Sequence, residues 1–352
     1  MLKFLLCLLG VASGLKVVAI GDLHGDYDTA LKTYRMAEIV DEEGHWMGGS
    51  ELTVVQTGDV LDRGDDTIKL FRWIMQLQNE AAQAGGTMVQ LLGNHEVMNL
   101  KEDYRYVTDQ EIASFGGEEA RAEAFSKDGW LGQYLRSRNI THQIGKTVFV
   151  HGGITSNWAE LGVDAINRES SGYLMDDSTK KLKRRKIFSS NKDSPLWFRG
   201  FSRDADCEQL SWALETLGAN RMVMGHTITS DRKIHTICDG QGLLIDVGLS
   251  SVFGGSRSAA VELTQTTTHA IYPGKKVSLP HVSGLDGQSK HTRKLVQETT
   301  LIPTPVPTPE PSKEPIPMLT QEPTQASIPV STQDSTQEFA PASNQDFIEI
   351  QA

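Results

Sequence analysis

The segment V-V-Q-T-G-D-V-L-D-R-G, residues Val54–Gly64, decides the fold of this chain. An apolar run, typical of a strand, leads into a tight loop that carries Asp59, Asp62 and Arg63. Glycines at both ends of the loop allow the backbone to bend sharply. Gly and Asp are also ordinary turn residues, so this segment alone does not separate a turn from a functional site.

Four other apolar runs along the chain also end in residue types that bind metal ions. The runs and the segments that follow them are Leu15–Ile20 with Gly21–Gly25, Thr87–Leu92 with Gly93–Glu96, Thr147–Val150 with His151–Gly153, and Arg221–Met224 with Gly225–Thr227. Strands of an open α/β sheet deliver such loops to one edge, where ligand sites form. The runs together predict a binuclear metal centre.

The spacing of apolar residues predicts the elements between these runs. Helices are expected at Asp26–Val40 and Asp65–Ala84, which would complete right-handed βαβ units. Glu96–Arg138 is expected to be mainly helical with a break at Ser114–Gly117, and its residues 97–138 are called the helical insert below. Short strands between Val223 and Tyr272 predict a second, largely antiparallel sheet.

Four of the polar segments resemble the signature motifs of the phosphoprotein phosphatases, which belong to the calcineurin-like metallophosphoesterases. These segments are Gly21–Gly25, Gly58–Gly64, Gly93–Glu96 and His151–Gly153. The resemblance continues through Pro195–Gly200, Val223–Thr227 and Asp246–Gly248, which look most like the Shewanella-like branch. The chain lacks the C-terminal Asn-Tyr-Cys-type segment of the eukaryotic Ser/Thr phosphatases, which argues against ordinary Ser/Thr phosphatase function.

The resemblance implies an α/β fold of a defined kind. Two mixed sheets are expected to pack face to face with helices outside, as a four-layer α/β/β/α sandwich. The catalytic domain would span residues 15–295, and the helical insert would form a cap beside the metal site. From the residues alone, the helical insert could equally be a packed surface subdomain.

The resemblance also implies a metal site, residue by residue. One metal ion would be held by Asp22, His24 and Asp59, and the other by Asp59, Asn94, His151 and His226. Asp59 would therefore bridge the two ions. Carboxylate, amide and imidazole ligands suit Mn²⁺, with Fe or Zn²⁺ as alternatives. Two such ions about 3.5–4 Å apart neutralise phosphoryl oxygens and activate water.

The remaining site residues follow from the same resemblance. His95 would be the general acid that protonates the leaving group, and Asp62 would orient its ring. Arg63 and Arg199 would bind the phosphoryl oxygens, together with Asn94, because a guanidinium suits bidentate contact with phosphate.

These residues predict a metal-dependent phosphomonoester hydrolase that acts as a protein phosphatase. The Shewanella-like resemblance implies that this phosphatase prefers phosphotyrosine. One alternative is a small-molecule phosphoesterase such as a dinucleoside polyphosphate hydrolase, which shares the metal motifs. The other is a non-catalytic phosphate-binding protein, which the complete set of ligands and acid argues against. The substrate would be a phosphorylated protein or a small phosphoester.

Composition and the chain ends add further expectations. A net charge of −11 argues against a nucleic-acid partner, and no stretch is long and apolar enough to span a bilayer. Met1–Gly14 has the layout of a signal peptide, which predicts a secretory or extracellular location and agrees with the sequon at Asn139. Residues 296–352, rich in Pro, Thr, Ser and Gln, are expected to form a disordered tail.

Two features stay open at this level. Signal cleavage would leave Cys207 and Cys238 free to pair in an oxidising compartment, but the sequence does not say whether they are close. The run Lys180–Lys186 contains six basic residues in seven positions. It could steer an anionic substrate or be a processing site, and a solvated surface is the favoured interpretation.

Overall fold

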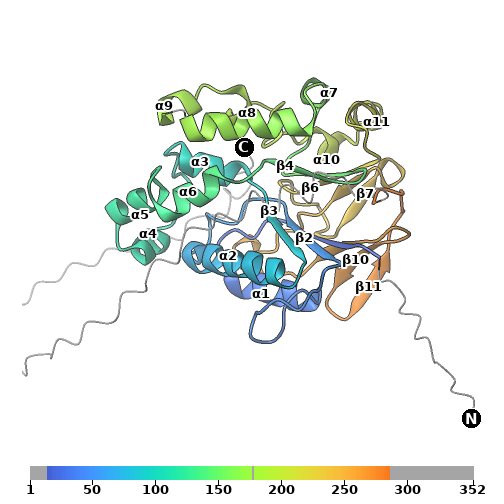
Figure 1. Ribbon diagram of the computed structural model, residues 1–352, viewed down its shortest axis with the longest axis horizontal. Coiled ribbons are helices and arrows are strands. Elements are labelled where there is room, and N and C mark those ends of the chain that lie inside the picture. The colour runs from blue at the N-terminus through green and yellow to red at the C-terminus, as the bar shows by residue number, and fades with distance from the viewer. Residues whose placement is uncertain (1–13, 177, 286–352) are drawn as a thin grey trace, which may run out of the picture. The chain divides into compact units, whose positions relative to one another are not determined.

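Two mixed β-sheets organise the computed structural model, which describes residues 14–176 and 178–285 (Figure 1). The first sheet has six strands in the order β11-β10-β9-β1-β2-β3, and the second has five in the order β4-β5-β6-β8-β7. The strands of the first sheet are β1 (Lys16–Ile20), β2 (Leu52–Gln56), β3 (Thr87–Gln90), β9 (Ala260–Leu263), β10 (Thr268–Tyr272) and β11 (Lys275–Ser278). Those of the second are β4 (Thr141–Ile144), β5 (Thr147–Val150), β6 (Arg221–Met224), β7 (His235–Ile237) and β8 (Gly242–Leu244).

Parallel pairing in the first sheet aligns three strand ends. Strand β2 pairs in parallel with both β1 and β3, so that Ile20, Gln56 and Gln90 share one register position. The loops that begin after these residues therefore leave the sheet side by side. They carry Asp22, Asp59 and the segment before Asn94.

The second sheet has a corresponding parallel core. Strand β6 pairs in parallel with β5 and β8, and Val150, Met224 and Leu244 are in register. The loops after these residues contain His151, Gly225–Thr227 and Asp246. Each sheet thus supplies one set of adjacent loops, as expected for ligand sites at strand carboxyl ends.

Helices cover the outer faces of both sheets. Helices α1 (Tyr27–Met36) and α2 (Thr67–Gln83) lie on one side, and α7 (Ser156–Ala159), α8 (Val163–Asp176) and α11 (Cys207–Thr216) lie on the other (Figure 1). The apolar face of α2, including Leu70 and Ile74, is buried in the shared core. The expected four-layer α/β/β/α sandwich is confirmed.

The helical insert is helical as expected, in four short pieces. They are α3 (Asn94–Leu100), α4 (Asp109–Phe115), α5 (Glu118–Phe125) and α6 (Trp130–Arg136). The expected break lies at Gly116, which has a φ of 94° and ends α4. The first piece begins slightly earlier than predicted, because Gly93 caps it and places Asn94 in its first turn.

The prediction of a second, largely antiparallel sheet from the later strands is wrong. Strands β6 to β8 belong to the second sheet, which is mixed, whereas β9 and β10 return to the first sheet beside β1. Strand pairing depends on tertiary packing, and the order of strands along the chain does not specify it. The exposed edge strand β11 was missed because Lys275–Ser278 shows no buried face.

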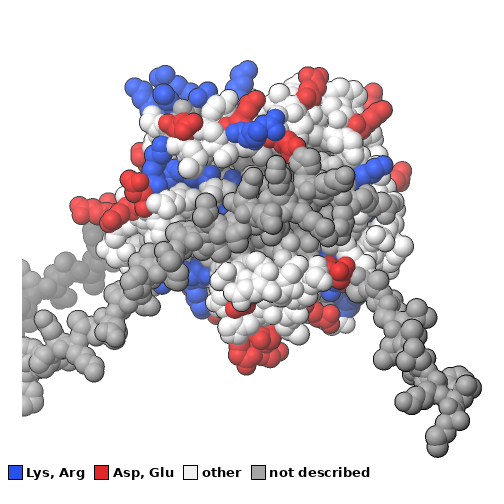
Figure 2. All heavy atoms as spheres, in the orientation of Figure 1, with Lys and Arg blue, Asp and Glu red and all other residues white. Residues whose placement is uncertain are grey.

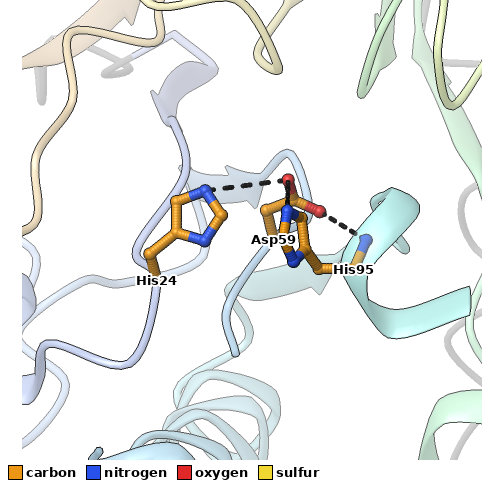
Figure 3. Close-up of side chains that lie close together, drawn as sticks. All are labelled: His24, Asp59 and His95. Carbon is orange, nitrogen blue, oxygen red and sulfur yellow. Dashed lines mark hydrogen bonds and ion pairs between the residues drawn. The ribbon is translucent and has the colours of Figure 1, made fainter. Parts of the chain in front are cut away.

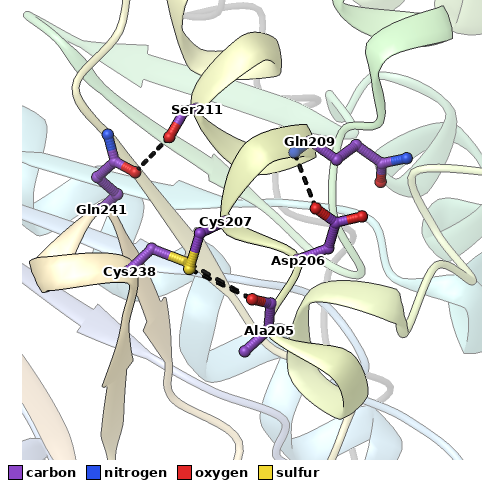
Figure 4. Close-up of a disulfide and its surroundings, with 7 residues drawn as sticks. All are labelled: Ala205, Asp206, Cys207, Gln209, Ser211, Cys238 and Gln241. Carbon is purple, nitrogen blue, oxygen red and sulfur yellow. Dashed lines mark hydrogen bonds between the residues drawn. A yellow bond between two sulfur atoms is a disulfide. The ribbon is translucent and has the colours of Figure 1, made fainter.

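A disulfide joins Cys207, at the start of α11, to Cys238, in the short 3₁₀ turn η2 (Cys238–Gly240) (Figure 4). The Cα atoms are 5.3 Å apart and the cysteines are 31 residues apart in sequence. This settles the pairing that the sequence left open. It ties the outer helix layer to the end of β7.

The basic run lies around α9 (Thr179–Leu182), at the upper left of Figure 2, where Lys and Arg gather. Lys180, Lys183 and Arg184 are exposed, and the Arg185 guanidinium lies 3.8 Å from the Tyr173 ring centroid. Leu182 within the run is buried. The run is a solvated surface with one apolar anchor, as the favoured interpretation has it, and its function stays open.

Other expectations fall on residues beyond those described. The expected signal peptide, apart from Gly14, and the expected tail from residue 296 lie outside the described residues and stay predictions. Among the described helices, none combines the length and apolar character needed to cross a membrane.

Candidate metal centre and phosphate site

The loops at the strand ends hold their side chains on strained backbone. Five site residues have positive φ angles between 43° and 70°: His24, Asp59, Asp62, Arg63 and His226. Non-glycine residues adopt this left-handed region only when the surrounding structure requires it, and such residues cluster at functional sites. Gly93 illustrates the tight fit, because a Cβ there would lie 2.2 Å from Asp59 Oδ1.

The first group of potential metal ligands consists of His24, Asp59 and His95 (Figure 3). Asp59 Oδ2 lies 3.8 Å from His24 Nε2 and 3.9 Å from His95 Nε2. The backbone N–H of His95 donates to Asp59 Oδ1 at 2.9 Å. Burial and the neighbouring His95 lower the pKa of His24 to about 3, so its imidazole is neutral.

The second group shares Asp59 and adds residues from the other sheet. His151 Nε2 lies 3.2 Å from Asp59 Oδ2, 3.1 Å from His226 Nδ1 and 2.9 Å from Asn94 Oδ1. All four residues are buried. Asp59 therefore belongs to both groups, which is the position expected of a bridging ligand.

Asp22 lies on the side of the second group. Its carboxylate accepts the His226 backbone N–H at 3.1 and 3.3 Å, and Oδ1 is 3.9 Å from His151 Nδ1. The sequence assigns Asp22 to the ion that His24 would hold, whereas the contacts of its carboxylate are with His151 and His226 of the second group. Asp22, Asp59 and His151 nevertheless converge, as the sequence predicts.

The hydrogen-bonding pattern at His151 fits a bound cation. Its Nδ1 lies 3.0 Å from the Thr57 carbonyl oxygen, which can only accept, so Nδ1 carries the proton. Nε2 faces the oxygens of Asp59 and Asn94, so these three atoms can converge on one cation.

The crowding of buried carboxylates also indicates a site for cations. Burial, together with Asp246 and Asp59, raises the pKa of Asp22 well above its usual range. Burial also raises the pKa of Asp246 to about 6. Cations would offset this negative charge, so the residues present fit metal ions.

His95 and Asp62 form a close pair. His95 Nδ1 is 2.7 Å from Asp62 Oδ2, and His95 Nε2 faces Asp59. Burial opposes the charged form of His95, but Asp59 and Asp62 outweigh it and raise its pKa. A protonated imidazole with Nδ1 held by a carboxylate can donate a proton from Nε2.

Both predicted arginines lie beside this cluster. Arg199 Nη1 donates to the His226 carbonyl oxygen at 2.6 Å and to Thr227 Oγ1 at 3.2 Å. The Arg63 guanidinium lies 4.3 Å from the ring centroid of Tyr106 and 5.5 Å from that of Phe253. The sequence offers Arg257, in a Gly/Ser-rich loop, as an alternative to Arg199 for the second phosphate-binding arginine, and Arg257 is exposed.

Several residues of the site were missed from the sequence. Glu96 accepts three backbone N–H groups, from Gly93, Asp59 and Val60, at 2.7 to 2.9 Å and so joins two ligand loops. Its place three residues after the helix cap is a known capping-box signal, which could have identified it. Tyr106 and Phe253 carry no comparable signal, because only tertiary packing brings them to Arg63.

Arg199 should contribute directly to catalysis. Replacing Arg199 with alanine should lower kcat/KM by roughly 10²–10³, because one preorganised donor to the phosphoryl group is lost. Metal content, measured by elemental analysis, should not change. Arg257→Ala is the matched control and should remain near wild type, and a crippled Arg257→Ala beside an active Arg199→Ala would reverse the assignment.

Comparisons with known proteins identify the family of the chain. The sequence profile of the calcineurin-like phosphoesterases matches residues 15–230. Shewanella-like protein phosphatase 2 of Arabidopsis thaliana is 33% identical, over 67% of this chain and 71% of that protein. An uncharacterized protein of Schizosaccharomyces pombe is 39% identical, over 75% of this chain and 82% of its own length.

A solved structure shares the fold as well. The crystal structure of the cold-active protein-tyrosine phosphatase of a psychrophilic Shewanella species superposes with a TM-score of 0.68 at 30% identity. The match covers 76% of this chain and 80% of that one. The chain therefore belongs to the calcineurin-like phosphoesterases, in the group of Shewanella-like protein phosphatases, and is a metal-dependent phosphatase.

Proposed function

We propose that this chain is a binuclear, Mn²⁺-dependent phosphatase that hydrolyses phosphotyrosine in proteins. The observation that carries the proposal is Asp59, whose carboxylate is shared by two groups of ligands next to the His95–Asp62 pair. When bound, the two ions would neutralise the phosphoryl oxygens and activate a water molecule. Asp59 would bridge the two ions, with His24 at one and Asn94, His151 and His226 at the other, and Asp22 adds a carboxylate beside His151 and His226.

The other residues have roles that follow from where they lie. Arg63 and Arg199 flank the ligands and would bind and orient the phosphoryl oxygens, together with Asn94. His95 would donate its Nε2 proton to the leaving oxygen, while Asp62 holds Nδ1. The proton transfer would make the phenol of tyrosine a neutral leaving group.

Two observations support tyrosine as the leaving group. The structure with a TM-score of 0.68 is described as a protein-tyrosine phosphatase. The rings of Tyr106 and Phe253 lie beside Arg63, and each also packs near a site histidine. Aromatic surfaces next to the phosphate site favour an aryl phosphate over an alkyl one.

A secretory location stays a prediction. The disulfide between Cys207 and Cys238 supports it, because disulfides persist mainly in oxidising compartments.

The test is a phosphopeptide panel run on metal-free and Mn²⁺-loaded protein. Identical peptides carrying phosphotyrosine, phosphoserine or phosphothreonine, and a dinucleoside polyphosphate, are assayed in parallel. We expect no turnover after chelation, restoration by Mn²⁺, and the highest kcat/KM for phosphotyrosine. A clear preference for phosphoserine or for the nucleotide would contradict the substrate assignment, and full activity of metal-free protein would contradict the mechanism.

A further inference from the structure

A line of buried polar side chains runs from the proposed acid His95 into the helical insert. Asn99 Nδ2 donates to Asp62 Oδ1 at 2.9 Å, on the opposite oxygen from the one that His95 contacts. Arg121 Nη2 donates to Asn99 Oδ1 at 2.6 Å and to Glu111 Oε1 at 2.8 Å. Relative exposures are 0% for Asp62 and Glu111, 1% for Asn99 and 3% for Arg121.

The chemistry of each group sets the direction of every bond. Arginine can only donate, so Arg121 must face the oxygen of the Asn99 amide. The nitrogen of that amide is thereby turned toward Asp62 Oδ1, and also toward the His95 carbonyl oxygen at 3.0 Å. Asp62 Oδ2 is left to accept from His95 Nδ1. An arginine two contacts away therefore fixes which way the Asp62 carboxylate is presented to the imidazole.

Arg121 is itself held in place on several sides. Its Nε also donates to Glu111 Oε1, at 3.1 Å, and its guanidinium lies 4.5 Å from the Phe125 ring centroid and 5.1 Å from that of Tyr104. Glu111 lies on α4 and Arg121 on α5, both in the helical insert. The anchor of the line thus lies outside the two sheets.

A contribution to fold stability does not by itself explain the buried pair of Arg121 and Glu111. A buried ion pair commonly stabilises a fold no better than apolar side chains of similar volume, because desolvation offsets the attraction. Apolar residues could fill the space among Phe115, Phe125 and Tyr104. The location of this pair at the end of bonds that lead to His95 favours a role in orientation.

The helical insert also contacts the Val54–Gly64 loop region directly. The Arg63 backbone N–H donates to the Tyr106 carbonyl oxygen at 2.8 Å, and Thr108 Oγ1 donates to Asp65 Oδ1 at 2.5 Å. The insert is therefore bonded to the loop that carries Asp59 and Asp62. Small displacements of the insert would be transmitted to the site.

We propose that Arg121 and Glu111 are positioning residues that hold the acid His95 in its donating orientation through Asn99 and Asp62. This inference rests on the proposed role of His95 as the general acid. It makes the helical insert part of the apparatus that positions the acid. General-acid catalysis requires the donor to lie within hydrogen-bond reach of the leaving oxygen, so a loosened ring loses rate.

The experiment compares Arg121→Met with wild type on two substrates, phosphotyrosine and p-nitrophenyl phosphate, with Mn²⁺ present. p-Nitrophenol leaves without much help from an acid, whereas the phenol of tyrosine needs the proton. We expect kcat for phosphotyrosine to fall about tenfold more than kcat for p-nitrophenyl phosphate, a part of the roughly 10²–10⁴ that general acids supply. KM and metal content should stay unchanged, and Arg121→Lys, which keeps a charged donor, should regain part of the loss.

The matched control is Arg136→Met. Arg136 is a buried arginine of the same insert, but its bonds go to the carbonyl oxygens of Phe125, Ser126 and Gly132. A structural defect of this kind should lower both rates by the same factor, in line with the loss of folded protein measured by thermal unfolding. Equal losses on both substrates in Arg121→Met would overturn the inference.

Two further variants keep the outcomes distinct. If Arg121→Met does not fold, Asn99→Ala should show the same selective loss on phosphotyrosine, and an Asn99→Ala protein with equal losses would also overturn the inference. His95→Asn serves as the reference. A fully active His95→Asn protein would contradict both the proposed role of His95 as the acid and this inference. An inactive His95→Asn protein together with a fully active Arg121→Met protein would contradict this inference alone.

Discussion

Replacing Asp59 with asparagine should remove both metal ions at once and lower kcat/KM by about 10³-fold or more. The expected size follows from the several kcal/mol that metal ions contribute to transition-state stabilisation, at about 1.4 kcal/mol per factor of ten. Asp59 Oδ2 is the atom that the two groups of ligands share. No other described carboxylate occupies that position in both groups.

The local backbone should tolerate this change. Asp59 has a φ of 55°, a conformation that asparagine adopts about as readily as aspartate. The amide oxygen of asparagine can still accept the His95 backbone N–H, which now reaches Asp59 Oδ1 at 2.9 Å. The substitution therefore removes charge while largely keeping shape.

Elemental analysis after dialysis, together with hydrolysis of a phosphotyrosine peptide, measures the result. Asp65→Asn is the matched control, because Asp65 is exposed, lies six residues further along, and belongs to neither ligand group. Burial opposes the charge of Asp59, but His151 and His95 hold the pKa of its carboxyl well below its usual range, so Asp59→Asn should lower the unfolding temperature of metal-free protein whereas Asp65→Asn should not. An Asp59→Asn protein that still binds two ions would refute the bridging role.

The convergence of the candidate metal ligands could be predicted because these residues lie next to strand ends. Ile20 and Gln56 are adjacent in the sheet, so the loops that carry Asp22 and Asp59 had to meet once the strands were parallel. A short apolar run followed by Gly and a ligand residue can be recognised in the sequence without a structure. His151 and His226 follow the same pattern in the second sheet.

The remaining features depend on contacts between distant segments. The prediction of which sheet the later strands join was wrong because β9 pairs with β1, more than 200 residues earlier in the chain. The contact between Arg121 and Asn99 likewise depends on how α5 packs against α3, which helical spacing does not specify. Tyr106 reaches Arg63 from a turn and Phe253 from a short 3₁₀ helix, and neither segment has a periodic pattern in the sequence.

The role of His95 separates two interpretations of the same geometry. His95 lies with His24 and Asp59 in a group that could bind a metal ion, yet its Nδ1 is held by Asp62 at 2.7 Å. A ligand and an acid make opposite demands on the ring. A ligand must present a lone pair, whereas the acid must keep a proton on Nε2, and the raised pKa of His95 favours the proton.

His95→Asn should therefore keep both metal ions and lower kcat for phosphotyrosine by roughly 10²–10⁴, the usual contribution of a general acid. The loss on p-nitrophenyl phosphate should be much smaller, because that leaving group departs without the proton. The backbone bond from residue 95 to Asp59 Oδ1 does not involve the side chain, so the Asp59 loop should stay in place. If His95→Asn loses metal in parallel with activity, His95 is a ligand, and the proton must reach the leaving oxygen from another group.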